Sequence, residues 1–354
     1  MIPAMVQKRM LRVLVVDDSA VVRTFLTALL EAEPDMVVVG VATSGEEAVV
    51  KVAQFKPDVA TMDIRMPGIG GLEAIRRIMR ETPLPIIVVS GQTDTDEVTA
   101  TFQAIEAGAV AFFPRPRGVG HQEHLTEAKR FIRTVRTMAE VRVVRRWALV
   151  PSATPALRPV PPSRARRVEI VALGASTGGP VVLATILSRI SRRVAVPVVI
   201  VQHMAEGFIE GFVEWLEKAA KFPVRIAVDG EPLLAGYAYV APDRRHLTVQ
   251  RGSVQLLDDV PDSGVRPSIG RLFASVGQSY GNEAFAALLT GMGSDGAREL
   301  AGLRAQGALT AIQSAESCVV SGMPGAAAKL GAHLWSGDPL RIADLITLHG
   351  RMMP

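Results

Sequence analysis

The sequence contains a single cysteine, Cys318, among its 354 residues. One cysteine excludes an intrachain disulfide and a metal site built from several cysteines. Cys318 has no local signature of a nucleophile, so we expect a small buried residue. The chain also lacks an apolar run of membrane-spanning length, and residues 1–10 do not follow the order of a signal peptide. We therefore expect a cytoplasmic protein that is not inserted in a membrane.

Aromatic residues and net charge are also low. The 39 basic and 35 acidic side chains leave a formal charge of +4. The basic excess lies in residues 142–167, which hold seven arginines and five prolines but no acidic residue, and whose only aromatic side chain is Trp147. This composition favours extended, solvated backbone and does not suggest a nucleic-acid partner. We expect an interdomain linker at 142–167, between domains at 1–141 and 168–354.

The first half alternates short apolar runs with amphipathic stretches. This pattern predicts strand–helix–strand units around a five-stranded, doubly wound parallel sheet. The expected strands are residues 11–16, 36–41, 58–62, 85–90 and 109–113.

Polar residues follow these expected strands. Asp17 and Asp18 close the first strand, Asp63 follows the third, Ser90 ends the fourth, and Arg115 follows the fifth. Three carboxylates at one sheet edge repel one another, and an all-oxygen donor set suits Mg²⁺ better than zinc. The metal would neutralise a phosphoryl group on Asp63. The alternative is that Asp17 and Asp18 merely cap the helix that starts near residue 20, which leaves Asp63 unexplained.

The second half contains a glycine-rich turn, Gly174-Ala-Ser176-Thr-Gly178-Gly179, after the apolar run at 168–173. A serine in a tight strand-to-helix turn is exposed to a base, as in a nucleophile elbow. Such turns also hold phosphates and dinucleotides. A dinucleotide site is disfavoured because no acidic ribose partner lies about 20 residues further on.

Two other apolar runs end on residues that could complete a hydrolytic site. One run ends at His203 and another leads to Asp295. If all three side chains lie at the carboxyl edge of one parallel sheet, they can converge on one crevice. Ser176 would then attack, His203 would carry the proton, and Asp295 would orient the imidazole. A structural hydrogen bond for His203 and a turn or cap role for Asp295 are the alternatives.

Both halves resemble known families. The first resembles a response-regulator receiver domain, through Val13-Leu-Val-Val-Asp17-Asp18-Ser-Ala, Thr61-Met-Asp63-Ile-Arg-Met-Pro67, Val89-Ser90 and Arg115-Pro116. The second resembles the protein-glutamate methylesterase domain of bacterial chemotaxis, through Gly174-Ala-Ser-Thr-Gly-Gly-Pro180, Gln202-His203-Met204, Ala241-Pro242 with His246, Arg266-Pro-Ser268, Leu289-Thr-Gly-Met-Gly293, Asp295-Gly-Ala297 and Ser321-Gly-Met-Pro324. The two matches cover nearly all of the chain.

The methylesterase resemblance implies hydrolysis of glutamyl methyl esters, with release of methanol, and deamidation of certain glutamines. The substrate would be a methyl-accepting chemoreceptor. The triad of the family falls on Ser176, His203 and Asp295, and its main-chain oxyanion contacts map near Thr177 and Met292. Ester hydrolysis would need no cofactor.

The receiver resemblance implies that Asp63 accepts phosphate from a histidine kinase. Asp17, Asp18, Asp63 and the Arg65 carbonyl would bind Mg²⁺. In the family the unphosphorylated receiver covers the esterase site, and phosphorylation opens it. The implied fold is a five-stranded doubly wound receiver followed by a mostly parallel α/β methylesterase domain, and a monomer is expected.

The resemblance also implies switch roles for Ser90, Phe112 and the residue at position 115. Receivers normally carry lysine there, whereas this chain has Arg115. A guanidinium fork differs from an ammonium in geometry, so we expect altered coupling between phosphorylation and esterase activity.

Three expectations from the residues remain open. Residues 237–257 are expected to add an antiparallel hairpin. A phospho-regulated binding module with an inactive esterase site is one alternative function, and an acyltransferase or peptidase with the same triad is another.

Overall fold

The computed structural model describes residues 9–350 except 92–94, 119, 142, 144–167, 191–193 and 261–264. Its internal contacts divide the chain into two units, Met1–Ser152 and Ala153–Pro354, each with its own buried core. The linker expected at 142–167 lies outside the described residues apart from Val143, so the proposed domain boundaries remain predictions. None of the helices in the described part of the chain is long and apolar enough to cross a membrane.

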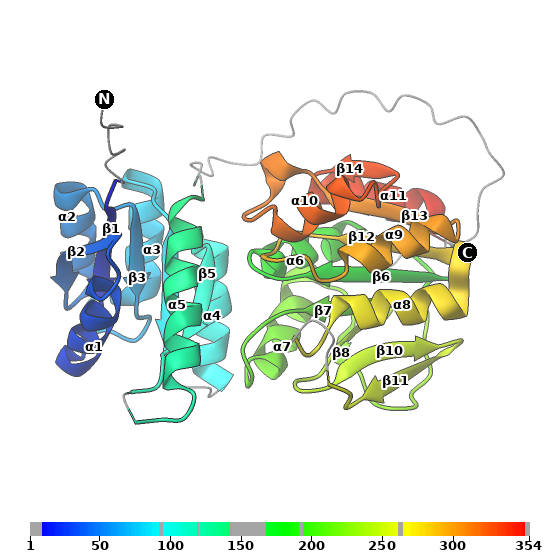
Figure 1. The fold of residues 1–354 in the computed structure, drawn as a ribbon, viewed down its shortest axis with the longest axis horizontal. Helices are drawn as coiled ribbons and strands as arrows, with labels where there is room; N and C mark the ends of the chain where they lie inside the picture. The colour runs from blue at the N-terminus through cyan, green and yellow to red at the C-terminus, as the bar shows by residue number, and fades with distance from the viewer. Residues whose placement is uncertain are drawn as a thin grey trace, which may run out of the picture. The chain divides into compact units, whose positions relative to one another are not determined.

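The first unit alternates strands and helices throughout (Figure 1). Its elements are β1 (Leu11–Val16), α1 (Ala20–Glu31), β2 (Met36–Ala42), α2 (Gly45–Phe55), β3 (Val59–Met62), α3 (Gly70–Glu81), β4 (Ile86–Ser90), α4 (Thr95–Ala107), β5 (Ala111–Pro114) and α5 (His124–Ala139). Each of the five strands begins and ends within two residues of the strand expected from the sequence, because a fully buried parallel strand appears in the sequence as a short apolar run.

All five strands of this unit pair in parallel, in the order β2-β1-β3-β4-β5. Helices α2, α3 and α4 pack in succession on one face, and α1 packs with α5 on the other. The strand order reverses between β1 and β3, so the loops after these two strands diverge and leave a crevice at their carboxyl ends.

The second unit is larger and also alternates strands with helices. Its elements are β6 (Ile170–Ala175), α6 (Gly179–Ile190), β7 (Val198–Gln202), α7 (Ile209–Ala220), β8 (Val224–Ile226), β9 (Ala238–Val240), β10 (His246–Gln250), β11 (Ser253–Leu257), α8 (Ile269–Tyr280), the 3-10 turn η2 (Gly281–Glu283), β12 (Ala284–Leu288), α9 (Ala297–Ala305), β13 (Leu309–Gln313), the 3-10 turn η3 (Ala315–Ser317), α10 (Gly322–Lys329), β14 (Trp335–Gly337) and α11 (Pro339–His349).

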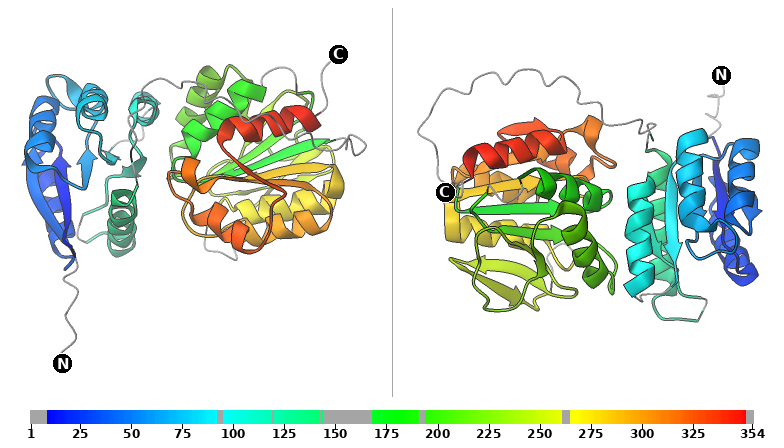
Figure 2. Two further views of the ribbon diagram at one scale, coloured as in Figure 1. Left: turned by 90° about the horizontal axis from the view of Figure 1, so that it is seen from above. Right: turned by 180° about the vertical axis from the view of Figure 1, so that it is seen from behind.

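Seven parallel strands form its main sheet, in the order β14-β13-β12-β6-β7-β9-β8. Helices α6, α7 and α11 cover one face and α8, α9 and α10 the other, as the view from above in Figure 2 shows. The order reverses at β6, which lies between β7 and β12. The crevice beyond the carboxyl end of β6 is therefore where a site is expected.

The hairpin expected at residues 237–257 is confirmed only in its second part. Strands β10 and β11 pair antiparallel as a separate ribbon, from His246 opposite Leu257 to Gln250 opposite Ser253. The first part was wrong, because residues 238–240 form β9, a parallel strand of the main sheet.

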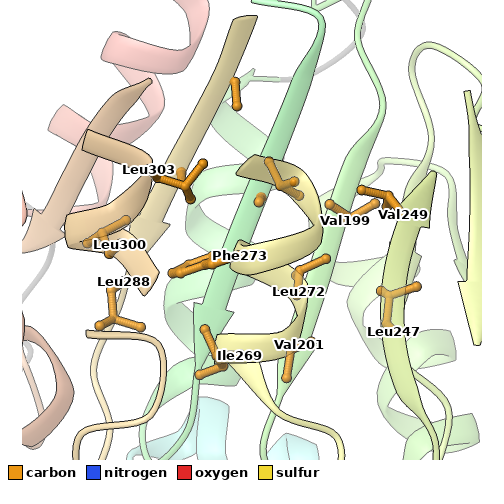
Figure 3. Close-up of a cluster of buried hydrophobic side chains, with 14 of the residues drawn as sticks. Val199, Val201, Leu247, Val249, Ile269, Leu272, Phe273, Leu288, Leu300 and Leu303 are labelled. Atoms are coloured by element: carbon orange, nitrogen blue, oxygen red, sulfur yellow. The ribbon is translucent and has the colours of Figure 1, made fainter. Parts of the chain in front are cut away.

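Helix α8 fills the space between the main sheet and this ribbon (Figure 3). Its apolar face lies in a cluster of fully buried side chains that includes Ile269, Leu272, Phe273, Val199, Leu247, Val249, Leu288 and Leu300. Burying each such side chain stabilises the fold by about 1.5–3 kcal/mol. The cluster fixes the N-terminus of α8, which is next to the candidate site.

Candidate active site and phosphorylation site

Ser176 and His203 extend from two neighbouring strands of the main sheet. Ala175 ends β6 and lies in register with Gln202, which ends β7. Ser176 and His203 are each the next residue, and the His203 N–H donates to the Ala175 carbonyl at 2.9 Å. The strand register therefore brings the predicted nucleophile and the predicted base to the same edge of the sheet.

Asp295 reaches the same edge from the other side of β6. It lies in the loop between β12 and α9, beyond the strand end itself, and its Oδ2 is 3.0 Å from His203 Nε2. Its two oxygens also accept hydrogen bonds from the first residues of α8 and the residue before it: Ile269 N at 2.7 Å, Ser268 Oγ at 2.9 Å and Gly270 N at 3.1 Å. The carboxylate thus sits at a helix N-terminus, which favours negative charge.

These contacts keep Asp295 ionised. Burial alone would raise the pKa of its carboxyl group, but the hydrogen bond and charge of His203 and the N–H groups of α8 lower that pKa below its ordinary value. A carboxylate accepts hydrogen bonds only, so Nε2 of His203 carries a proton in this contact. Nδ1 is then the ring nitrogen left to act as a base.

Ser176 is half-buried. The Ser176 N–H donates to the Thr290 carbonyl at 3.0 Å, and its own carbonyl accepts from Gly179 N at 2.8 Å. Among the residues that the structure describes, its hydroxyl has no hydrogen-bond partner. The turn therefore holds the main chain of Ser176 while the hydroxyl stays available.

Two close backbone approaches need glycine at this edge. A Cβ on Gly291 would lie 2.6 Å from the Ser176 Cβ, and one on Gly179 would lie 2.0 Å from Oε1 of Gln202. Both distances are below normal contact, so a larger residue would displace the nucleophile turn. The glycine-rich segments thus bring the loop after β12 against the loop after β6.

Thr177 and Met292 lie in these two adjoining loops. The Thr177 carbonyl accepts from Thr290 Oγ1 at 2.9 Å, which ties the loops together. Within the described part of the chain, no hydrogen bond uses the main-chain N–H of Thr177 or of Met292. Both N–H groups therefore remain available to a ligand beside Ser176.

Gln202 holds the two strand ends at a fixed spacing. Its buried side-chain amide donates to the carbonyl of Ser176 at 2.9 Å and to the carbonyl of His203 at 2.8 Å. One nitrogen donates both of its hydrogens, which fixes the amide orientation because its oxygen would repel these carbonyls. Gln202 thus bonds to both residues of the predicted nucleophile–base pair.

Gln202, His246, Ser268 and Gly291 were named only within the motifs that resemble the methylesterase family, and the sequence predicted no role for them. For Gln202 a signal existed, since a polar residue at the end of a buried strand needs a specific partner. The roles of the other three could not be predicted, because their contacts join segments far apart in the sequence.

The first unit holds a second cluster of polar side chains, at its own sheet reversal. Asp17 and Asp18 follow β1 and Asp63 follows β3, as predicted, and one carboxylate oxygen of each lies within 4.8 Å of the others. Burial and the neighbouring Asp17 charge raise the pKa of Asp63 to about 6. Burial also raises the pKa of Asp17. These carboxylates form a group that can hold a metal ion.

Arg115 approaches this acidic pocket from the end of β5. Its Nη2 lies 3.4 Å from Asp17 Oδ2 and 3.8 Å from Asp63 Oδ2. Its main-chain N–H donates to the carbonyl of Ser90, the buried last residue of β4, at 2.6 Å. The guanidinium of Arg115 thus spans two carboxylates, those of Asp17 and Asp63.

The other residues predicted for the receiver lie nearby in the fold. Phe112 is in β5, where its ring packs edge-on against Phe102 with centroids 5.7 Å apart. Arg65 is two residues after Asp63, and its N–H lies 3.4 Å from Asp63 Oδ1.

Cys318 does not have the chemistry of a nucleophile. Burial raises the pKa of its thiol to about 12, so the thiolate is not populated near neutral pH. The side chain is half-buried, somewhat more exposed than predicted.

The fold and the two clusters of polar side chains define a two-part protein. One α/β unit has an acidic cluster like that of a phosphoryl-acceptor domain, and the other has a hydrolase-like cluster of Ser, His and Asp. The family model for the response regulator receiver domain matches residues 13–127, and that for CheB methylesterase matches residues 171–346. The chain belongs to the CheB methylesterase family with an N-terminal receiver domain.

Curated relatives match along nearly the whole chain. Protein-glutamate methylesterase/protein-glutamine glutaminase 4 of Geobacter metallireducens is 52% identical, over 96% of this chain and 98% of its own length. Protein-glutamate methylesterase/protein-glutamine glutaminase of Nitrosospira multiformis is 50% identical, over 91% of this chain and 92% of its own length. Protein-glutamate methylesterase/protein-glutamine glutaminase 1 of Syntrophus aciditrophicus is 45% identical over 98% and 100%.

Proposed function

We propose that this protein is a phosphorylation-regulated protein-glutamate methylesterase and protein-glutamine glutaminase that acts on methyl-accepting chemoreceptors in the cytoplasm. The observation that carries the proposal is the His203–Asp295 contact of 3.0 Å at the end of β7, in register with the Ser176 turn at the end of β6. Family membership and the names of the relatives supply the substrate class.

Acylation follows from this geometry. Ser176 Oγ attacks the carbonyl carbon of the glutamyl methyl ester while His203 Nδ1 takes its proton. The N–H groups of Thr177 and Met292 stabilise the negative oxygen of the tetrahedral intermediate. As the carbon–methoxy bond breaks, His203 returns the proton to the leaving oxygen, which releases methanol and leaves a glutamyl ester on Ser176.

Hydrolysis of this ester regenerates the enzyme. His203 takes a proton from water as the water oxygen attacks the acyl carbon, and it then protonates Ser176 Oγ as that bond breaks. The product is the glutamate side chain. Asp295 stabilises the imidazolium in both halves, and a glutamine substrate would release ammonia in place of methanol. None of these steps needs a cofactor.

Regulation is assigned to the first unit. Asp63 would take a phosphoryl group from a histidine kinase. The oxygen donors of Asp17, Asp18 and Asp63 lie within 4.8 Å of one another and fit a hard divalent cation such as Mg²⁺. With the Arg65 carbonyl, they would hold the ion, which supplies positive charge beside the phosphoryl group. Ser90, Phe112 and Arg115 would respond to phosphorylation.

Two alternatives use the same residues. A binding module with an inactive esterase site would need a broken triad distance; the His203–Asp295 contact is made, and the methanol assay tests whether Ser176 reacts. An acyltransferase or peptidase would share the triad but would not release methanol from a methylated receptor.

Methanol release tests the proposal. The full-length protein is incubated with methylated chemoreceptor, with and without a small-molecule phosphodonor. We expect release from the wild type, an increase with phosphodonor, and none above background from Ser176→Ala. Deleting residues 1–141 should raise the basal rate and remove the response, as the family resemblance implies. Methanol release by Ser176→Ala would contradict the serine mechanism.

A further inference from the structure

His246 is a buried titratable residue that the proposed reaction does not use. It begins β10, and its side chain is fully buried. Its ring makes two hydrogen bonds, one at each nitrogen. Nδ1 accepts from the main-chain N–H of Ser268 at 3.1 Å, and Nε2 lies 3.2 Å from the carbonyl of Asp259.

These partners fix the ring as a neutral tautomer. The Ser268 N–H is a donor, so Nδ1 carries no proton, while the Asp259 carbonyl is an acceptor, so Nε2 carries one. Burial lowers the pKa of His246, and the charges of Arg271 and Arg266 lower it further. The imidazole is therefore held in the one form that can accept from Ser268.

Ser268 connects His246 to the candidate active site. It is the residue before α8, with an extended backbone at φ −111° and ψ 131°, and its Oγ accepts from Arg271 N at 3.3 Å. The same Oγ donates to Asp295 Oδ1 at 2.9 Å, and Asp295 Oδ2 contacts His203 Nε2 at 3.0 Å. An unbroken chain of hydrogen bonds thus runs from His246 to the predicted base.

We infer that His246 is a positioning residue of the hydrolytic site, which acts by holding Ser268 and, through Ser268, the carboxylate of Asp295. This inference rests on the proposed function. His246 touches no reacting atom in it. Displacement of Ser268 would remove one of the four hydrogen bonds that orient Asp295 and would let the His203 ring turn away from Ser176.

Two substitutions separate this role from simple space filling. In His246→Asn the side-chain oxygen can take the place of Nδ1 and keep the Ser268 bond. In His246→Gln the amide nitrogen can take the place of Nε2 and keep the Asp259 bond, while the Ser268 bond is lost. Asp259 is exposed, so water can replace the partner that the asparagine variant removes. Glutamine is closer to histidine in volume. If His246 only filled space, the glutamine variant would therefore be more active than the asparagine variant.

The experiment measures methanol release from methylated receptor by full-length wild type, His246→Asn, His246→Gln and Ser176→Ala. We expect the asparagine variant to keep kcat within about threefold of wild type. We expect the glutamine variant to lose roughly 10- to 100-fold in kcat with KM nearly unchanged, because positioning fails and binding does not.

Equal kcat values, or a more active glutamine variant, would overturn the inference while leaving the proposed function intact. A wild type that releases no methanol would overturn both. If a variant does not fold, ¹⁵N NMR of the wild-type ring decides the question. A protonated Nε2 and a hydrogen-bonded, unprotonated Nδ1 across the pH range of activity support the inference, and a protonated Nδ1 there overturns it.

Discussion

Asp63 and Asp295 are two aspartates with similarly little side-chain exposure, yet their environments shift their pKa values in opposite directions. Each lies beyond the carboxyl end of a strand where a parallel sheet reverses its order, and their side chains are 7% and 10% exposed. Burial and the nearby Asp17 raise the pKa of Asp63 to about 6. Burial also acts on Asp295, but hydrogen bonds from His203 and α8 lower its pKa.

The difference shows that neighbours decide what a buried carboxylate does at such an edge. Asp63 has other carboxylates beside it, and among the described residues Arg115 lies within ion-pair distance of it, so this group of carboxylates could hold a metal ion. The described donors around Asp295 come from His203, from Ser268 and from the first residues of α8. The surroundings of Asp63 raise its pKa, whereas those of Asp295 keep the carboxylate charged and in place.

The largest loss of activity should come from removing the proposed nucleophile or the proposed base, which Asp295 orients. Ser176→Ala and His203→Ala should each lower kcat for methanol release by roughly 10⁴- to 10⁶-fold, and the double variant should be no worse than the more damaged single one. Circular dichroism of each variant controls for folding. Multiplying losses in the double variant would show that the two residues do not act as a unit.

A smaller loss is expected from Gln202→Glu. The carboxylate would face the carbonyl oxygens of Ser176 and His203, where the amide now donates, and should lower kcat by roughly 10- to 100-fold. Gln202→Met has similar length without the charge and serves as the matched control, with a milder loss. If both variants retain wild-type kcat, the spacing of the two strand ends does not depend on this side chain.

Arg115→Lys sharpens the comparison on the Asp63 side. The guanidinium now spans Asp17 and Asp63, whereas an ammonium would act as a point charge on one partner. We expect the ratio of phosphorylated to unphosphorylated turnover to rise by about two- to fivefold at matched phosphate occupancy. A ratio that stays the same or falls would mean that arginine serves equally well as the switch residue.

The smallest effect concerns pH and stability. The folded protein holds the pKa of His246 below its ordinary value of 6.5, so in the unfolded chain this residue binds a proton at higher pH than in the folded chain. Its contribution to stability is full above pH 6.5 and is lost as pH falls below that value. Thermal unfolding from pH 7 to pH 5 should show a fall in Tm for wild type that exceeds the fall for His246→Asn by on the order of a degree or two. Identical falls would show that His246 titrates alike in both states.

Much of this arrangement follows from local sequence. Apolar runs of strand length predicted all five strands of the first unit, and the polar residues after them predicted Asp17, Asp63 and Arg115 at one edge. Ser176 and His203 could be placed in the same way, because each directly follows a buried strand.

The remaining features depend on tertiary contacts. Asp295 is seven residues beyond the end of β12, and its position comes from the N-terminus of α8, more than 20 residues earlier in the chain. The parallel pairing of β9 with β7 and β8 likewise depends on packing, since a three-residue apolar strand has no local signal for its partner. The amide of Gln202 and the ring of His246 are used through partners that sequence spacing does not indicate.

The most direct test exchanges each of the two aspartates for asparagine in the full-length protein. Methanol release from methylated receptor is measured for wild type, Asp295→Asn and Asp63→Asn, each with and without a small-molecule phosphodonor. We expect Asp295→Asn to lose roughly 10⁴-fold of kcat in both conditions, while Asp63→Asn loses only the increase that phosphodonor causes. A phosphodonor response that survives in Asp63→Asn, or near-normal turnover by Asp295→Asn, would contradict this expectation.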